Sequence, residues 1–306
     1  MNIVVIGAGG VGGYFGGKLA KAGFDVTFIA RGKHLEAIKE RGLQVKSILG
    51  DFIVYTKATD KLNEIKNPDL VILGVKSWQV LGVAQELKSV ITPGTMVLPL
   101  QNGADNADTL LSVLPKEHVL AGLSKIVSKV ESPGVINHFA FEPEIIFAEY
   151  NSENTERIRK LKAVFDKAGF KNTLSKDIQL DIWRKFLFIT MVSGIGAITR
   201  VIYKYLQQSD EIKEIIWKTG EEVVAVANAK GISLKKQDIE FSMQAFMNSA
   251  PNTTASMQRD LMEGKPSELE NFNGYIVNQG KRLGVDTPTN AFIYHCLLPQ
   301  EIIARS

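Results

Sequence analysis

Residues 2–12 read NIVVIGAGGVG, and this stretch decides the fold of the amino-terminal part of the chain. Residues 2–6 form a short apolar run that is typical of a buried strand, and a glycine-rich turn follows at once. Residues 13–22 have the composition of a helix that ends at Gly23. Strand, glycine turn and helix in this order predict the first unit of a Rossmann fold, whose helix amino terminus binds the pyrophosphate of a dinucleotide.

The glycines of this turn have separate roles in the prediction. Gly7 permits the tight turn, Gly9 lets the backbone approach the pyrophosphate, and Gly12 lets the helix pack closely on the strand. A structural glycine turn without a ligand is the alternative. The predicted cofactor-binding segment consists of Gly7, Ala8, Gly9, Gly10, Val11 and Gly12.

The second predicted strand, residues 25–30, indicates which dinucleotide is bound. Sites for NAD usually carry Asp or Glu near the end of this strand, where the carboxylate binds the ribose hydroxyls. Here Arg31 follows the strand and no carboxylate is present. A guanidinium binds a 2′-phosphate bidentately, whereas a carboxylate repels it, so Arg31 favours NADP(H). The alternative is a solvated surface arginine. Lys33 and His34 either assist Arg31 or are plain surface charges.

The composition is that of an ordinary soluble protein. A length of 306 residues allows a sizeable core and favours two domains. Apolar residues make up 45% and charged residues 23%, and a net charge of +3 is too small to indicate nucleic-acid binding. Cys296 is the only cysteine, which excludes an intrachain disulfide, and the four histidines lack metal-binding spacing.

Targeting and membrane signals are not expected either. The apolar amino terminus lacks a basic leader, and its glycines fit a Rossmann unit better than a signal peptide. The chain has no uninterrupted apolar run of roughly 18 residues, so no spanning helix is expected. We therefore predict a cytoplasmic enzyme without nucleic-acid partner, membrane partner or bound metal.

Strands and helices alternate in the first part of the chain, which predicts a parallel, doubly wound sheet. Residues 42–56 alternate without helix signals and predict a small hairpin. Two helices are expected at residues 79–90 and 154–168. Further strands are expected at residues 70–75, 95–100, 118–130, 134–139, 145–149 and 171–175.

Only helical periodicity is found after residue 176. Five helices are expected, at residues 178–200, 210–230, 234–247, 267–283 and 288–303. The predicted fold is therefore an α/β Rossmann-type, doubly wound amino-terminal domain of residues 1–176. An all-α carboxy-terminal domain of residues 177–306 follows it.

Two polar residues follow predicted strands at the edge where open α/β sheets bind ligands. Lys76 comes directly after the strand at residues 70–75, and Asn102 follows the strand at residues 95–100. A cation and an amide at this edge suit an anionic substrate, the cofactor ribose or the nicotinamide. The alternative is that Lys76 is a surface charge and Asn102 belongs to a turn.

Lys185 lies in a predicted helix that is apolar on nearly every face. Burying a lysine there is costly unless the side chain snorkels, pairs or faces a polar cleft. Lys185, Ile189 and Ser193 share one stripe of the helix. A lysine facing a cleft could protonate a carbonyl oxygen while hydride adds to the carbon. Snorkelling to the surface is the alternative.

A second acidic candidate comes later in the chain. Ser267 and Glu270 have the spacing of a capping box, which predicts the start of a helix. Glu268 is then placed in the first turn. From its position alone, Glu268 is interpreted as a surface acid that complements the helix dipole.

Taken together, these features resemble the ketopantoate reductase family, which reduces 2-dehydropantoate to pantoate with NADPH. The resemblance covers the whole chain, and Glu268 follows Ser256 by 12 residues, as in the family pattern. The matching segments are Gly7–Gly12, Arg31, Val75–Gln79, Asn102-Gly103, Trp183-Arg184-Lys185, Ser256-Met257, and Ser267-Glu268 leading to Asn273-Gly274.

The resemblance implies roles for the catalytic and substrate-binding residues. Lys185 would be the general acid toward the 2-keto oxygen. Glu268 would hold a substrate hydroxyl and help to orient Lys185. Ser256 would bind the substrate carboxylate. Asn102 would hold cofactor and substrate near the nicotinamide.

The resemblance also implies the remaining cofactor contacts. Lys76 would bind near the ribose, and Arg31 would bind the 2′-phosphate of NADPH/NADP+. Gln79 would be a further cofactor-binding residue. The substrate would be a small anionic 2-keto acid.

The chain departs from the family pattern where the substrate binds. Many members carry Asn at the fourth and eighth positions after the catalytic lysine, and this chain has Ile189 and Ser193 there. A substrate oxygen that relied on the first amide would lose a hydrogen bond, at a cost of about 1–3 kcal/mol. Ser193 is kept as a candidate substrate-binding hydroxyl. A different, more apolar 2-keto acid is therefore an open alternative.

The leading hypothesis is a reduction in which NADPH lies across the carboxyl edge of the sheet and the keto acid sits between the domains. A second alternative is a sensor that binds NADP(H) without catalysis, because a Rossmann fold does not fix function. A homodimer is one candidate assembly. Trp217, Phe241 and Phe246 would suit either an interface or a core.

Overall fold

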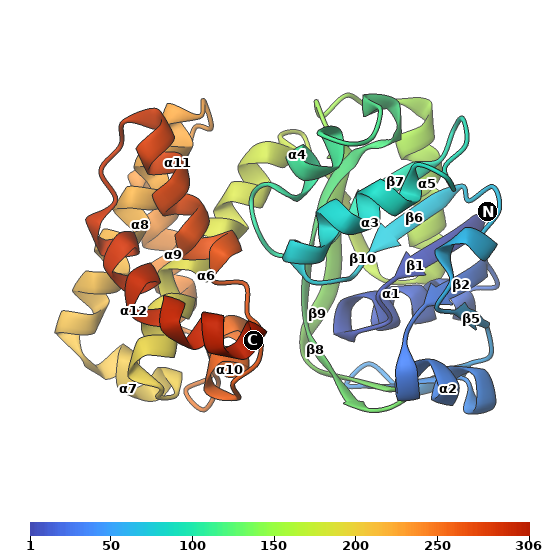
Figure 1. The fold of residues 1–306 in the computed structure, drawn as a ribbon, viewed down its shortest axis with the longest axis horizontal. Coiled ribbons are helices and arrows are strands. Elements are labelled where there is room, and N and C mark those ends of the chain that lie inside the picture. Colours follow the sequence, from blue (N-terminus) through green and yellow to red (C-terminus); the bar gives the residue numbers. More distant parts are fainter. The chain divides into compact units, whose positions relative to one another are not determined.

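The computed structural model describes residues 1–306 and divides them into two compact units, Met1–Ile178 and Gln179–Ser306 (Figure 1). The first unit contains both sheets of the molecule, and the second unit is helical. The predicted boundary at residues 176/177 lies close to this division.

The first sheet has the strand order β5-β2-β1-β6-β7, and all its pairings are parallel. Its strands are β1 (Asn2–Ile6), β2 (Asp25–Ile29), β5 (Lys57–Thr59), β6 (Leu70–Leu73) and β7 (Met96–Pro99). The connecting helices are α1 (Gly10–Lys21), α2 (Gly32–Arg41), α3 (Val80–Leu87) and α4 (Asn106–Leu111). The chain leaves β1 toward β2 and later returns to its other side as β6. The carboxyl ends of β1 and β6 therefore form the switch point at which doubly wound folds bind nucleotides.

The second sheet is mixed, so the expectation of one parallel sheet is wrong for residues 118–175. Its strands are β3 (Leu43–Ser47), β4 (Phe52–Val54), β8 (Leu120–Ser132), β9 (Val135–Glu149) and β10 (Lys171–Leu174), with α5 (Glu156–Ala168) before β10. The predicted hairpin is confirmed by the antiparallel pair β3–β4. The turn at Pro133-Gly134 folds β8 back antiparallel on β9. Gly134 has φ +81°, which favours glycine.

β9 is a single strand, although two strands were expected over its length. Pro143 cannot donate a hydrogen bond to a ladder. It lies between the segment of β9 that pairs with β3 and the segment that pairs with β10. It also falls opposite an irregularity in β8, between Lys125 and Val127. No ladder bond is lost at this position, so the strand continues through the proline.

The core of the first unit gathers around α1. Its side chains Tyr14, Phe15 and Leu19 are buried and belong to one cluster with residues of both sheets and of α5. Gly16 lets the helix lie close to the first sheet, because a Cβ atom at this position would approach the ring of Phe28 to 2.6 Å. This packing fixes the amino terminus of α1 at the carboxyl edge of β1.

The second unit contains the predicted helices and two short ones that sequence periodicity missed. Its helices are α6 (Ile178–Thr199), α7 (Tyr203–Gln208), α8 (Asp210–Ala229), α9 (Lys236–Met247), α10 (Ser256–Met262), α11 (Tyr275–Leu283) and α12 (Pro288–Arg305). α7 and α10 span fewer than two turns each, which is too short for a repeat of 3.6 residues to show. Phe246 is fully buried in this unit, whereas Phe241 is exposed.

α6 is the central apolar helix of the second unit. It meets the length and composition criteria for a membrane span, which the sequence analysis did not anticipate. However, 67% of its apolar window is buried inside the structure, as in the core helix of a soluble protein. Trp183, Phe186 and Met191 are among its buried side chains.

Residues 267–283 do not form one continuous helix. A π-helical turn, Glu270–Gly274, precedes α11, and the N–H of Gly274 donates to the carbonyl of Leu269 over 3.0 Å. The predicted capping box is wrong. The hydroxyl of Ser267 donates to Glu301, and the carboxylate of Glu270 accepts from Tyr294. Both side chains therefore bond to residues of α12, Glu301 and Tyr294, instead of capping the start of their own helix.

Candidate functional site

The glycine turn after β1 brings three backbone segments unusually close together. Gly7 has φ +93°, and its N–H donates to the carbonyl of Ile29 over 3.0 Å. A Cβ atom at Gly12 would overlap the carbonyl oxygen of Gly7. A Cβ atom at Gly74 would lie 2.8 Å from the same oxygen, so the glycine that follows β6 belongs to this arrangement. Sequence analysis missed Gly74, although a glycine at the end of an apolar strand is a signal of close backbone approach.

Gly9 differs from these glycines because the space beside it is open. Apart from Gly9 and its two chain neighbours, no protein atom lies within 4 Å of an ideal Cβ atom at Gly9. Gly9 is the N-cap of α1, and no side chain caps the helix there. The first N–H groups of α1 and the positive end of its dipole lie at this turn and are not capped by a side chain. These features fit the pyrophosphate of a dinucleotide.

The other residues of the turn help to hold it. A Cβ atom at Gly10 would lie 2.5 Å from the carbonyl oxygen of Ser128 in β8. Ala8 is buried, and Val11 packs against the core of the first unit. The turn is therefore packed against β8 at Gly10 and against the core of the first unit at Ala8 and Val11.

His34 holds the turn in place by two hydrogen bonds. The N–H of Gly134 donates to Nδ1 of His34 over 3.0 Å, so this nitrogen carries no proton. The proton is therefore on Nε2, which donates to the carbonyl oxygen of Ala8 over 2.8 Å. The expectation that His34 is a plain surface charge is wrong. The ring is neutral and joins the turn to the β8–β9 connection.

Stability is expected to fall in mild acid because of His34. Burial lowers the pKa of His34 below its ordinary value, and the bond to Ala8 opposes this less strongly. The unfolded chain takes up a proton as the pH falls below about 6.5, whereas the folded chain resists it. The free energy of unfolding is therefore unaffected above that pH and decreases as the pH falls toward the folded pKa. Urea unfolding at about pH 7.5 and about pH 5.5 measures this loss.

The control for this prediction is His34→Gln, which removes the titrating ring but keeps a donor for Ala8. Its loss of stability between the two pH values is expected to be smaller than that of the unchanged protein. Equal losses in the two proteins would show that His34 does not cause the acid sensitivity.

Arg31 lies at the same edge of the sheet as the glycine turn. It is the N-cap residue of α2, directly after β2, and β2 pairs with β1 in register. Its side chain is exposed, and no carboxylate forms an ion pair with its guanidinium. A cation at this place suits a phosphate on the adenosine ribose.

The loops after β6 and β7 are joined to each other. The hydroxyl of Ser77 donates to the carbonyl oxygen of Asn102 over 2.6 Å, which brings the loop of Lys76 and the loop of Asn102 together. The Nζ of Lys76 lies 5.7 Å from the ring centroid of Trp78. Gln79 is exposed, and its side-chain oxygen accepts the N–H of Lys76 over 3.1 Å. Gln79 therefore has a structural role as a local cap.

Gln101 is a polar residue of this edge that the sequence analysis did not select. It is 7% exposed, and neither its amide nitrogen nor its amide oxygen has a hydrogen-bond partner. Buried amides are normally satisfied. Its place directly before Asn102, after a strand end, was the signal that could have found it.

In the second unit, Lys185 and Ile189 are partly buried on α6. Ser193, on the same stripe, is 1% exposed, and its hydroxyl has no hydrogen-bond partner. The neighbouring cation Arg184 donates to Asp238 on α9 over 2.8 Å. Two adjacent basic residues of α6 thus have different environments.

Glu268 is 4% exposed, so its interpretation as a surface acid is wrong. It precedes the π-helical turn, a local irregularity that is frequent at functional sites. Ser256 is the first residue of α10 and is partly buried. Burial of a carboxylate is costly, which indicates that Glu268 has a use other than solubility.

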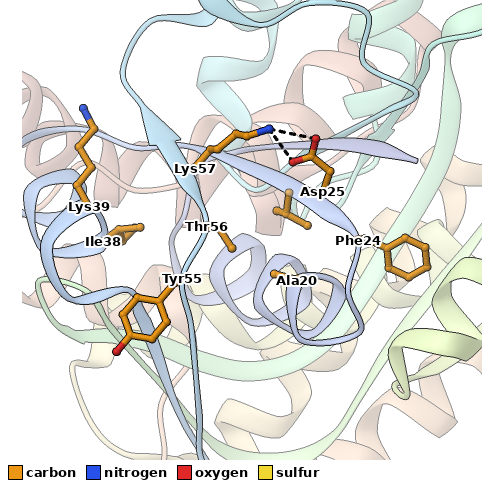
Figure 2. Close-up of a pocket in the computed structure, with 9 residues that line it drawn as sticks. Ala20, Phe24, Asp25, Ile38, Lys39, Tyr55, Thr56 and Lys57 are labelled. Atoms are coloured by element: carbon orange, nitrogen blue, oxygen red, sulfur yellow. Dashed lines mark hydrogen bonds and ion pairs between the residues drawn. The ribbon is translucent and has the colours of Figure 1, made fainter.

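A cavity of about 420 Å³ lies at the opposite edge of the first sheet (Figure 2). It is lined by the amino-terminal ends of β2 and β5 and by the last turns of α1 and α2. Lys57 pairs with Asp25 at its rim, at 3.0 Å (Figure 2). Helix carboxyl ends carry a partial negative charge, so this cavity is unsuited to a pyrophosphate. It is separate from the candidate site.

Comparisons with known proteins identify the family of the chain. The sequence profile described as Ketopantoate reductase PanE/ApbA matches residues 3–152, and the profile of its C-terminal part matches residues 177–301. The chain belongs to the ketopantoate reductase family. It is an oxidoreductase with a Rossmann fold, and its cofactor is NADP(H).

Individual relatives cover almost the whole chain. A 2-dehydropantoate 2-reductase of Pyrococcus abyssi is 30% identical, with 99% of both chains covered. The crystal structure of a PanE/ApbA family ketopantoate reductase from Ralstonia eutropha is 31% identical, with a TM-score of 0.92 and full coverage of both chains. The ternary structure of D-mandelate dehydrogenase with NADH and anilino(oxo)acetate is 25% identical, with a TM-score of 0.91 and coverage of 100% and 99%.

Proposed function

We propose that this ketopantoate reductase family member reduces 2-dehydropantoate to pantoate with NADPH. The observation that carries the proposal is a helical unit, matched to the family over residues 177–301, that holds Lys185 on an apolar helix and Glu268 as a buried carboxylate. A protein that only sensed NADP(H) would need neither residue in such costly surroundings. Several relatives of the chain are named 2-dehydropantoate 2-reductase, which supports the same activity.

The proposed general acid is Lys185. Bound NADPH supplies a hydride to the C2 carbon of the keto acid. The ammonium of Lys185 stabilises the negative charge that forms on the keto oxygen and then transfers a proton to it. The lysine is left as a neutral amine and recovers a proton from solvent. The product is a 2-hydroxy acid.

The remaining polar residues would hold the substrate. Glu268 would accept a hydrogen bond from a substrate hydroxyl and help to orient Lys185. Ser256 would donate to the substrate carboxylate. Asn102 would donate to cofactor and substrate near the nicotinamide, and Ser193 would offer a hydroxyl from α6.

The cofactor would be held by the first unit. The amino terminus of α1 would bind the pyrophosphate through the open space beside Gly9. Arg31 would bind the 2′-phosphate. Lys76 and Gln79 would lie near the ribose, and the amide nitrogen of Gln79 would be the donor, because its amide oxygen accepts the N–H of Lys76.

A second candidate is the reduction of a different, more apolar 2-keto acid. Ile189 is the observation that favours it, because many family members carry Asn at this position on the substrate-binding stripe of α6. A branched apolar side chain would favour an apolar substituent over a hydroxyl. The similarity to D-mandelate dehydrogenase, whose structure holds anilino(oxo)acetate, also supports a substrate with an apolar substituent.

A panel of 2-keto acids tests both candidates. We expect measurable kcat/KM with NADPH for 2-dehydropantoate, and phenylglyoxylate is the apolar comparison. If 2-dehydropantoate exceeds all others by roughly 100-fold or more, the first candidate holds, because a few hydrogen bonds in the pocket give this much discrimination. The reverse order establishes the second candidate. NADPH binding without oxidation by any keto acid would contradict both.

The proposed enzyme acts on a small anionic substrate in the cytoplasm, without a nucleic-acid or membrane partner. Its net charge of +3 gives little attraction for nucleic acid. A homodimer is proposed as one assembly, with the exposed Phe241 of α9 as a candidate contact residue.

A further inference from the structure

The last helix of the second unit clamps the backbone beside Glu268. The N–H of Ser267 donates to both carboxylate oxygens of Glu301, at 3.0 and 3.1 Å, and its hydroxyl donates to Oε2 at 2.5 Å. Arg305, one turn further along α12, donates to the carbonyl oxygen of Ser267 over 3.0 Å. It also pairs with Glu301 at 2.6 Å. One carboxylate and one guanidinium thus satisfy both backbone groups of Ser267.

The residues on the other side of Glu268 are fixed as well. The hydroxyl of Ser267 accepts the N–H of Leu269 over 3.2 Å. The carbonyl of Glu268 accepts the N–H groups of Asn271 and Phe272, at 3.1 and 3.0 Å, where the π-helical turn begins. Ser267, Glu268 and Leu269 are all buried. The backbone of Glu268 therefore has little freedom to move, and the direction of its Cα–Cβ bond is fixed.

Glu301 is a costly way to hold a chain segment. It is 2% exposed, and a buried carboxylate is tolerated only when charge and hydrogen bonds compensate it fully. Here its two carboxylate oxygens accept hydrogen bonds from Ser267 and Arg305. A neutral contact could connect α12 to this segment at lower cost. Such fully satisfied supports are typical beneath functional residues that must be aimed accurately.

We propose that Glu301 is a positioning residue that, through Ser267, aims the carboxylate of Glu268 at the substrate. Arg305 pairs with Glu301 and holds it in place. This inference rests on the proposed function, which assigns Glu268 to a substrate hydroxyl. Loss of the clamp leaves the cofactor-binding unit unchanged and disturbs only the substrate contact.

The first test is Glu301→Gln, which keeps the side-chain shape but turns an amide donor toward the donors of Ser267. We expect KM for the keto acid to rise and kcat/KM to fall about tenfold or more, since a displacement of about 1 Å at a reacting group can cost about 100-fold. The Kd of NADPH is expected not to change. Ser267→Ala removes the two hydrogen bonds of the hydroxyl but keeps those of the backbone N–H, and it is the milder variant. It is expected to raise KM as well, and it serves as the test if Glu301→Gln does not fold.

Glu149→Gln is the matched control in the first unit. Glu149 is also a buried carboxylate paired with an arginine, Arg157, and bonded to a hydroxyl, Thr155. Its replacement is expected to lower the melting temperature while KM for the keto acid stays unchanged. A matching rise in KM for this variant would mean that loss of stability alone explains the result for Glu301→Gln.

A double-mutant cycle decides between positioning and a general structural role. The readout is the Kd of the 2-hydroxy acid product in the presence of NADP+, which needs no turnover. Glu301→Gln is expected to weaken binding clearly in the unchanged protein and by less than about twofold in a Glu268→Gln background, because coupled residues are not additive. Equal weakening in both backgrounds overturns the proposal. If the unchanged protein reduces no 2-keto acid, the proposed function fails, whatever the variants do.

Discussion

Lys185→Ala is expected to lower kcat about 100- to 10,000-fold, the range that a general acid contributes. The ammonium both stabilises the forming alkoxide and supplies its proton, and alanine can do neither. Affinity for NADPH is expected to survive, because the glycine turn and Arg31 belong to the first unit and Lys185 to the second. Steady-state kinetics with the preferred keto acid and a fluorescence titration with NADPH measure the two effects separately.

Two further variants make the result for Lys185 specific. Lys185→Met keeps the apolar stem and is expected to lose as much activity as alanine, which excludes a packing defect. Arg184→Ala removes the adjacent cation, whose partner is Asp238, and is expected to cost stability but to keep kcat within a few-fold. Normal turnover by Lys185→Ala would remove this residue from the mechanism. Equal losses for Arg184→Ala and Lys185→Ala would point to damage to α6.

Gly12→Ala is expected to destabilise the first unit and to abolish NADPH binding. The added Cβ atom would overlap the carbonyl oxygen of Gly7 and approach Cγ1 of Val5 to 3.0 Å. The carbonyl oxygen belongs to the backbone of the turn, which cannot rotate away as a side chain can. Overpacking of this kind costs about 1–3 kcal/mol, and the turn that binds the pyrophosphate must shift with it. Urea unfolding and NADPH titration measure the two losses.

Two other glycines provide controls for this result. Gly9→Ala meets no protein atom, so stability should stay within about 0.5 kcal/mol, while the methyl group fills the space proposed for the pyrophosphate and weakens NADPH binding. Gly82→Ala lies inside α3 in open space and should stabilise the protein by about 0.5–1 kcal/mol without any effect on binding. Unchanged NADPH affinity in Gly9→Ala would refute the proposed position of the pyrophosphate.

The sequence could predict features that depend on neighbouring residues. The strand–turn–helix at residues 2–21, the hairpin of β3 and β4, and the long helices α6, α8 and α12 follow from local periodicity and turn residues. The fold class is therefore confirmed. α10 is short, and its periodicity was too brief to detect, although its first residue, Ser256, was selected by family resemblance.

Features that depend on distant partners could not be predicted. His34 bonds to Ala8 and to Gly134, which is 100 residues away in sequence, so the residues around His34 could not predict this link. Ser267 matched a capping box, but Glu301, 34 residues later, takes its hydrogen bonds. Glu268 consequently became a buried carboxylate instead of an exposed one.

The amino-acid sequence by itself determined the opening strand–turn–helix, the long helices of the second unit and the presence of Arg31, Lys185 and Glu268, because these depend on short-range propensity and on residue identity. Tertiary structure alone decided which polar groups are paired, buried or open to a ligand. The reason is long-range packing. A charge that is buried without a partner is costly, so the buried carboxylate of Glu301 is hydrogen-bonded to Ser267. The open space beside Gly9 is likewise a property of the folded chain, because it depends on which distant segments pack near the turn.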